Sequence, residues 1–278
     1  MGQKETEPGN ILCTFWYPEG VKERVAFSGD FFIGKVDEST VLKFPCGEEG
    51  DDMAPWLRRE YERILEGLQV ERKIYERIGK HPRIIEFKGW QDSGPGLLLE
   101  FAPNGDLAHF LHDQSEHLSV KHRLRIARET AEGIDFVHTK NVLVRDVATR
   151  NILLDAGKHV KLCDLTGVLL GDDGSVIAAG QGWEDSDATK PRPDTQHADR
   201  STDLFALGTA IFNIMTGQCP FPDTDDDQEI KQLFEQRKYP ELDERLGGKV
   251  VWGCWDSLYE SAGEVAKDLE KLEQTYPQ

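Results

Sequence analysis

Apolar residues recur at three- and four-residue steps in several segments of the chain, which is the spacing of one face of an α-helix. The longest such segment runs from Pro55 to Ile78, with apolar positions at Leu57, Tyr61, Ile64, Leu65, Leu68, Ile74, Tyr75 and Ile78. Pro55 suits a first helical turn and Gly79 suits a helix end. Gly67 could divide the segment into two helices.

The second half of the chain is predicted to be mostly helical. Its helix-like segments are residues 120–138, 203–215, 230–237, 250–259 and 261–272. The last begins with a capping-box pattern, Ser261 and Glu264.

The first hundred residues also contain short apolar runs between turn residues, which are typical of β-strands. The predicted strands are residues 24–27, 31–36, 40–44, 83–90 and 96–101. Gly29-Asp30 separates the first two strands in the manner of a hairpin turn. The chain is therefore expected to be an α+β protein, with a small antiparallel sheet and one long helix before the helical part.

Residues 141–167 combine three polar side chains with a predicted β-hairpin. Asp146 is followed by Asn151 five residues later and by Asp164 thirteen residues after that. Two short apolar runs around a turn, within residues 152–163, predict a hairpin that brings Asn151 and Asp164 side by side. One carboxylate can meet a hydroxyl proton, while the amide and the second carboxylate can hold a divalent cation against phosphates. These are the groups that phosphoryl transfer needs.

This segment resembles the catalytic loop of eukaryotic protein kinases, in which His-Arg-Asp precedes an Asn and, later, Asp-Phe-Gly. Val144-Arg145-Asp146 and Asp164-Leu165-Thr166 occupy those places here. The resemblance extends from about residue 22 to residue 272 and implies a bilobal protein kinase fold. The implied parts are an N-terminal extension at 1–21, an N-lobe at 22–102 and a C-lobe at 103–278.

The resemblance also implies residue roles. Asp146 would orient or deprotonate the acceptor hydroxyl, and Asn151 and Asp164 would bind Mg²⁺. Lys43, in the middle of an apolar strand, would hold the phosphates of ATP, supported by Glu71. Glu71 matches the family's helix glutamate, because it lies ten residues before His81-Pro82, where the family's chain usually leaves the loop after that helix. This match favours Glu71 over Glu62 and Glu76 as the partner of Lys43. Arg150 lies four residues after the catalytic Asp, and an arginine at that position is typical of tyrosine kinases. The other implied nucleotide contacts are Val41, Leu99, Glu100, Ala102 and Leu153.

The family's glycine loop is incomplete in this chain. Gly29, Phe31, Gly34 and Val36 fall in the places of the Gly-x-Gly-x-x-Gly-x-Val pattern, with the middle glycine replaced. Two interpretations stay open. The two glycines could still cover phosphates, or Gly29-Asp30 could be an ordinary hairpin turn.

Residues 167–200 correspond to the activation segment of the family and contain no tyrosine. The sequence Glu-Asp-Ser-Asp at 184–187 is already acidic, so regulation by phosphorylation is not expected. Lys-Pro-Arg-Pro at 190–193 replaces the usual Ala-Pro-Glu, and the arginine that normally pairs with that glutamate is also missing. If the backbone at Thr166 requires a positive φ, its β-branched side chain costs about 1–2 kcal/mol.

Composition limits the partners. The formal net charge is −18 at pH 7, which argues against binding nucleic acid or anionic lipid. No apolar run reaches about 18 residues, so no membrane span is predicted. Five scattered cysteines without metal-ligand spacing are interpreted as reduced thiols of a cytoplasmic protein. Residues 1–6 fit a myristoylation pattern at Gly2, but a disordered polar start is the stronger interpretation because no polybasic signal follows.

Three functions are compatible with these residues. The first is an ATP- and Mg²⁺-dependent protein kinase that acts slowly on a protein substrate, because the catalytic and phosphate-holding residues are present. The alternative is a pseudokinase that binds a protein partner, which the damaged glycine loop and Thr166 favour. A small-molecule kinase of related fold is disfavoured by the helix motif at 203–208. The sequence segments VRDVATRN, STDLFALG and GCW resemble those of kinase-like proteins of filamentous fungi.

Overall fold

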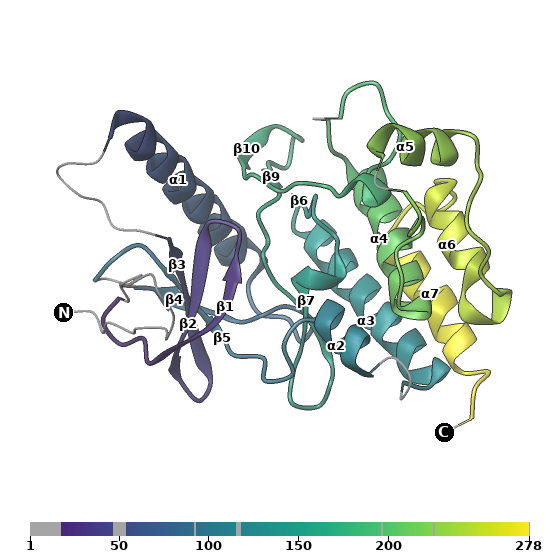
Figure 1. Cartoon of the computed structure of the whole chain (residues 1–278), viewed down its shortest axis with the longest axis horizontal. Helices are drawn as coiled ribbons and strands as arrows, with labels where there is room; N and C mark the ends of the chain where they lie inside the picture. The colour runs from purple at the N-terminus through teal and green to yellow at the C-terminus, as the bar shows by residue number, and fades with distance from the viewer. Residues whose placement is uncertain are drawn as a thin grey trace. The chain divides into compact units, whose positions relative to one another are not determined.

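The computed structural model describes residues 18–46, 54–91, 93–114, 118–195, 197–224 and 226–277 (Figure 1). The predicted myristoylation site at Gly2 lies outside the described residues. The chain divides into two units. Unit 1 is Met1–Lys80 with Ile85–Phe101, and unit 2 is His81–Ile84 with Ala102–Gln278.

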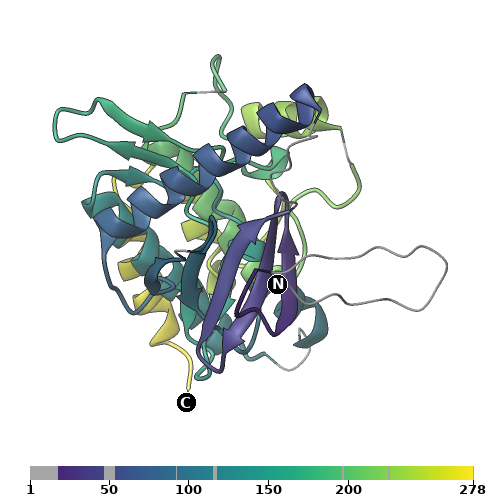
Figure 2. The same cartoon turned by 90° about the vertical axis from the view of Figure 1, so that its left-hand side faces the viewer.

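Unit 1 contains a five-stranded antiparallel sheet in the order β1-β2-β3-β5-β4. Its strands are β1 (Glu23–Ser28), β2 (Phe31–Asp37), β3 (Thr40–Pro45), β4 (Phe87–Trp90) and β5 (Leu97–Glu100). β1 and β2 form a hairpin, drawn in purple in Figure 2. The predicted strand at 83–90 is wrong in its first half, because Ile84 instead forms a parallel bridge with Leu162 of unit 2.

The long helix of unit 1, α1 (Pro55–Ile78), is continuous over 24 residues, so Gly67 does not divide it. Pro55 occupies the first turn, and Gly79 ends the helix with φ at 66°. Six of the eight predicted apolar positions are buried, from Tyr61 to Ile78, whereas Leu57 in the first turn is 42% exposed. It packs on the sheet through Tyr75, whose ring stacks on Phe87 with 5.9 Å between centroids.

The pairing of the strands assigns each side chain of the sheet to one of two faces, since directly opposed residues point the same way. Lys43 is opposite Ile33 and Leu97, so these three share a face. Leu42 is opposite Gly34 and Leu98 and points to the other face. A core cluster fills that other face; it consists of Val21, Leu42 and Phe44, with Phe32, Val36 and Leu98 packed against them.

Unit 2 is mostly helical. Its helices are α2 (Leu107–Gln114), α3 (Val120–Thr139), α4 (Arg200–Thr216), α5 (Asp227–Glu235), α6 (Gly248–Trp255) and α7 (Ala262–Glu273). α3 packs on α4 and α7, and α4 on α6 (Figure 1). α4 is buried along most of its length and ends at Gly217, whose backbone has the left-handed helical conformation. With the sheet of unit 1, this confirms the predicted α+β architecture, a small antiparallel sheet with one long helix followed by a mostly helical part.

Two small sheets complete unit 2. β7 (Ile152–Leu154) and β8 (Val160–Leu162) form the predicted antiparallel hairpin. β6 (Val142–Leu143), β9 (Val168–Leu170) and β10 (Val176–Ala179) form a three-stranded sheet in the order β10-β9-β6. The capping box at the start of α7 is only half as predicted. Ser261 accepts from the Glu264 N–H, but the Glu264 carboxylate accepts from Glu260 N–H.

Candidate active site

In unit 1, the site is built on a buried ion pair between β3 and α1. The Nζ of Lys43 donates to Oε2 of Glu71 at 2.7 Å. The two side chains are only 3% and 0% exposed. A buried ammonium needs such a partner, because an unpaired charge away from water is costly. The partner is Glu71, as the spacing to His81 predicts, and not Glu62 or Glu76.

The face of the sheet that carries Lys43 also carries two of the other predicted site residues. Val41 and Leu99 lie directly opposite each other on β3 and β5. Both are buried. The ring of Phe31 lies on this face as well, with its centroid 4.8 Å from Lys43 Nζ.

Gly34 and Val36 lie on the opposite face of the sheet from Lys43. A Cβ at Gly34 would lie 2.5 Å from Cγ1 of Val21, so the glycine allows close packing in the core cluster. Val36 packs against the same cluster. This register is inconsistent with the expectation that Gly34 and Val36 contact a nucleotide held by Lys43. In the observed register Ile33, and not Gly34, shares a face with Lys43. The family pattern is thus displaced by one residue along β2, and a shift of one residue moves a side chain to the other face of the sheet.

The turn between β1 and β2 is a two-residue hairpin turn. Gly29 adopts φ of 54°, a conformation that favours glycine. The Asp30 carboxylate forms an ion pair with Arg63 of α1 at 3.0 Å. Asp30 also accepts a hydrogen bond from Cys46 N–H through its carbonyl, at 2.8 Å. Of the two interpretations left open for Gly29, the structure therefore favours an ordinary hairpin turn.

Two of the implied nucleotide contacts, Glu100 and Ala102, lie at the end of β5 and just after it. The Glu100 N–H donates to the Glu86 carbonyl at 2.9 Å, and the Phe101 N–H donates to the Ser39 carbonyl at 2.8 Å. Ala102 is the first residue after β5 that belongs to unit 2, and it is buried. The amide groups of Glu100 and Phe101 are thus already used within unit 1.

In unit 2, the catalytic-loop residues are joined by short contacts. Arg150 Nη2 donates to Oδ1 of Asp146 at 2.6 Å, and Arg150 also pairs with Asp185. The Asn151 side chain donates to the backbone carbonyl of Asp146 at 3.1 Å. Burial raises the pKa of Asp146 above its usual value, while the neighbouring Arg150 guanidinium opposes that rise. A raised pKa makes the ionised carboxylate a stronger base toward a hydroxyl proton.

The β7–β8 hairpin brings the two predicted metal ligands to one end. Ile152 is opposite Leu162, and the Cys163 N–H donates to the Asn151 carbonyl at 3.0 Å. Asn151 therefore directly precedes β7, and Asp164 lies two residues after β8, at the same end of the hairpin. This is the arrangement that the sequence predicts. Leu153 is the half-buried residue of β7, between two buried neighbours.

The condition for strain at Thr166 is not met, because its φ is not positive. Arg145 and Asp164, on either side of the hairpin, do have positive φ, at 64° and 54°. A glycine is required at position 167, one residue after Thr166, because a side chain there would collide with the backbone of β6. A Cβ at Gly167 would lie 1.8 Å from the Leu143 carbonyl oxygen, because β6 and β9 pair there.

The donor set of Asn151 and Asp164 fits Mg²⁺. This ion prefers hard oxygen ligands and is commonly held by one or two carboxylates together with substrate phosphates and water. In the described ranges, no cluster of three or more His, Cys, Asp or Glu side chains is arranged to hold a metal. An ion held by Asn151 and Asp164 would take its remaining ligands from nucleotide phosphates and water.

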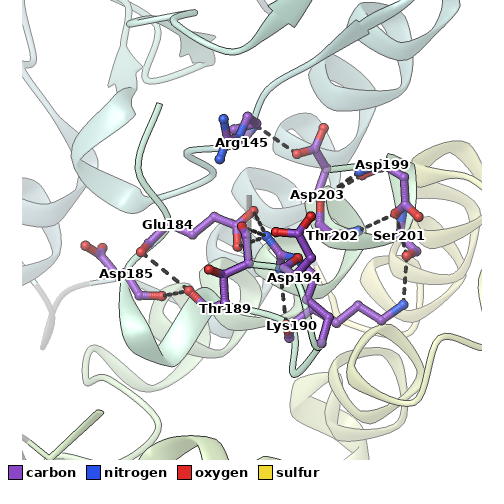
Figure 3. Close-up of polar contacts among 12 residues, drawn as sticks. Arg145, Glu184, Asp185, Thr189, Lys190, Asp194, Asp199, Ser201, Thr202 and Asp203 are labelled. Carbon is purple, nitrogen blue, oxygen red and sulfur yellow. Dashed lines mark hydrogen bonds and ion pairs between the residues drawn. The ribbon is translucent and has the colours of Figure 1, made fainter. Parts of the chain in front are cut away.

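Asp203 of α4 fixes the backbone that leads into the catalytic loop (Figure 3). Its carboxylate accepts from the N–H groups of Val144 and Arg145 at 2.7 and 2.8 Å. The Nε2 of His138 lies 2.8 Å from the same carboxylate. His138, to which the sequence assigns no role, is thus a buried partner of Asp203. Asp203 is itself 1% exposed.

The activation segment contains an ion pair that sequence reasoning missed. Arg192 Nη2 lies 2.9 and 2.8 Å from the two carboxylate oxygens of Glu184. The side chains are 10% and 6% exposed. Arg192 lies within the stretch that replaces Ala-Pro-Glu, so a cation stands in the region where the family has an acid. The acidic run at 184–187 was the available signal, but its partner could not be identified from spacing alone.

We expect Arg192→Met to lower the free energy of unfolding by about 3 kcal/mol, because it leaves the buried Glu184 carboxylate without its counter-ion. Denaturant unfolding measures this change. The matched control is Arg245→Met, whose partner Asp243 is exposed, and its loss of stability should be much smaller because water screens the pair. Adding Glu184→Leu to Arg192→Met should restore part of the stability. Equal losses in the two single variants would contradict the importance of the buried pair.

Comparison with known proteins identifies the family of this chain. Residues 57–261 match the family described as "Protein tyrosine and serine/threonine kinase". The chain is 26% identical over 224 residues to the probable serine/threonine-protein kinase SIS8 of Arabidopsis thaliana, covering 76% of this chain and 21% of that protein. It is 25% identical over 254 residues to the dual specificity protein kinase shkA of Dictyostelium discoideum, covering 86% and 48%.

A third relative is the mouse serine/threonine-protein kinase A-Raf, 27% identical over 166 residues, covering 55% of this chain and 26% of that protein. The chain thus spans about a fifth to a half of the length of these relatives. In the described ranges, none of the helices is both long and apolar enough to cross a membrane. The family match covers most of the described residues of both units, and the chain belongs to the protein tyrosine and serine/threonine kinase family.

Proposed function

We propose that this protein is an ATP- and Mg²⁺-dependent protein kinase that slowly phosphorylates a hydroxyl group of a protein substrate. The observation that carries the proposal is the catalytic loop of unit 2. Asp146 is held by Arg150 at 2.6 Å, and Asn151 is tied to the Asp146 backbone. The relatives named above are serine/threonine and dual specificity kinases, which supports serine or threonine as the acceptor.

Each residue has a defined task in this proposal. Asp146 orients the acceptor hydroxyl and takes its proton, and Lys43 stabilises the phosphate charge. Asn151 and Asp164 hold Mg²⁺, which neutralises charge on the phosphates when bound. Glu71 fixes the position of the Lys43 ammonium.

The proposed slowness follows from the β1–β2 turn. A two-residue turn with the Asp30 carboxylate engaged by Arg63 offers no glycine-rich backbone cradle for phosphates. The loss of a single donor to the transition state costs about 3 kcal/mol, or two to three orders of magnitude in rate. The lost cradle therefore lowers the rate without removing the residues that perform the transfer.

A pseudokinase is the second candidate, and one observation favours it. The ring of Phe31 lies against Lys43, on the side chain that would hold phosphates. If nucleotide cannot displace that ring, the fold would serve only to bind a protein partner. A small-molecule kinase gains no support, because the matching family consists of protein kinases.

A thermal-shift titration with Mg²⁺ and ATP separates the two candidates. We expect ATP at a hundred times its Kd to raise the melting temperature by about 5 °C, and EDTA to reduce the shift. Lys43→Met and Asp164→Asn should each lose most of the shift. Lys80→Met is the matched control, because this lysine is exposed on unit 1. A wild-type protein that shows no shift at millimolar ATP would support the pseudokinase.

A further inference from the structure

The ring of Phe31 lies over the ammonium of Lys43, with 4.8 Å between Nζ and the ring centroid. Phe31 begins β2, two residues before Ile33, and Ile33 is directly opposite Lys43. Alternate residues of a strand share a face, so Phe31 and Ile33 both lie on the face that carries Lys43. A cation at this distance over an aromatic face is attracted by the ring's negative quadrupole.

This contact competes with phosphate for the same ammonium. A phosphate oxygen must come within about 2.8 Å of Nζ to form a charge-assisted hydrogen bond. The Lys43 side chain is only 3% exposed, and its bond to Glu71 is already 2.7 Å long. A neighbouring group must therefore move before a phosphate can reach Nζ. Glu71 comes from a buried helix face, whereas Phe31 stands next to a turn and is only half-buried.

We propose that Phe31 is the affinity-determining residue of the nucleotide site. Its ring lies against the ammonium of Lys43 and must leave before ATP phosphates bind. This inference rests on the proposed function, because it concerns the same nucleotide. It predicts that the wild-type protein binds ATP weakly and that removing the ring strengthens binding.

The surrounding contacts hold Phe31 in place. The turn before it is tied to α1 by the Asp30–Arg63 ion pair and to β3 by the Cys46 N–H. The next residue, Phe32, points to the other face, where its ring lies 5.4 Å from Phe27 and 5.8 Å from Phe44. Phe31 cannot change faces unless the whole register of β2 shifts. The ring must instead rotate away on its own face of the sheet.

The test compares Phe31→Ala with Phe27→Ala. Phe27 belongs to the same hairpin, lies on the opposite face and is 62% exposed, so its loss controls for general loosening of the hairpin. Isothermal titration with Mg²⁺ and ATP measures Kd. We expect Phe31→Ala to lower Kd by about tenfold and Phe27→Ala to leave it within about twofold. Phe31→Leu keeps apolar volume but lacks the ring face, and should fall between the wild type and Phe31→Ala.

A second measurement does not depend on nucleotide. The rate of acetylation of Lys43 by acetic anhydride, followed by mass spectrometry, should rise severalfold in Phe31→Ala and stay unchanged in Phe27→Ala. If Phe31→Ala proves too unstable to purify, Phe31→Leu carries the same comparison.

Three outcomes are distinguishable. Tighter binding in Phe31→Ala alone supports the inference, even if the wild type binds too weakly to measure. Equal Kd values with phosphoryl transfer intact overturn the inference but leave the proposed function standing. No binding in any variant, together with no transfer, overturns both.

Discussion

Asp146→Asn is expected to lower the rate of phosphoryl transfer to a protein substrate by roughly 10²- to 10⁴-fold. The substitution keeps the shape of the side chain and removes the carboxylate that takes the hydroxyl proton. The bond from the Asn151 side chain goes to the backbone carbonyl of residue 146, so it survives the change. Arg150 can still donate to the new amide oxygen. Catalysis should therefore fall while the structure of the loop persists.

The measurement is the initial rate of label transfer from γ-labelled ATP, with Kd for ATP determined on the same samples. Kd should change by less than about threefold, because Asp146 is not proposed to touch the phosphates. Asp155→Asn is the matched control, since Asp155 lies in the turn of the neighbouring hairpin and accepts two backbone N–H bonds that Asn can also accept. A variant at position 146 that keeps a third of the wild-type rate would show that transfer does not use this carboxylate.

Asp203→Ala is expected to lower the free energy of unfolding by about 4 kcal/mol and the melting temperature by about 10 °C. The carboxylate is 1% exposed and accepts from two backbone amides and from His138. Removing it leaves these buried donors without an acceptor, and each such donor costs about 1–3 kcal/mol. Part of that cost is recovered if water enters the space.

The same change should also lower catalysis at temperatures where the variant is folded. Arg145 has φ of 64°, a conformation that costs a non-glycine residue about 1–2 kcal/mol. Its N–H bond to Asp203 helps to hold that conformation directly before Asp146. We expect transfer to fall by at least tenfold in Asp203→Ala and by less in Asp203→Asn, which keeps one acceptor oxygen.

The matched control is Asp199→Ala in the same helix. Asp199 is the N-cap of α4, is exposed to solvent and accepts from Ser201 and Thr202 N–H groups. Its loss should cost about 1 kcal/mol, the usual value for a helix cap. Unfolding by urea, monitored by circular dichroism, measures both variants. If Asp203→Ala costs no more than Asp199→Ala, the buried carboxylate does not organise the loop.

Local patterns predicted those parts of the site that depend on neighbours in the chain. The apolar runs around the 155–158 turn predict the β7–β8 hairpin, and the hairpin alone brings Asn151 next to Asp164. The resemblance to protein kinases implies Glu71 as the partner of Lys43, and the local signal that fixes the match is His81, which follows the same continuous helix. The predicted roles of Asp146, Asn151 and Asp164 remain proposals until transfer is measured.

The register of β2 could not be predicted. The glycine pattern places Gly34 and Val36 with Lys43, but the strand pairing places Ile33 opposite Lys43. Both assignments fit the amino-acid spacing, because β2 has large apolar residues at adjacent positions 31, 32 and 33. A strand without clear alternation does not specify its face, so the packing of Phe32 and Gly34 against Val21 and Phe44 decides it.

The sequence by itself determined the long helices, the five-stranded sheet, the catalytic-loop hairpin and the residue types for phosphoryl transfer, but not the short elements α2, β6, β9 and β10. The predicted features depend on propensity and spacing over a few residues. Only the tertiary structure decided which face of β2 meets Lys43, that Phe31 covers its ammonium, and that Glu184 pairs with Arg192. These contacts join groups on different strands or on opposite sides of a loop. Their energies come from burial and charge pairing, which no spacing along the chain encodes.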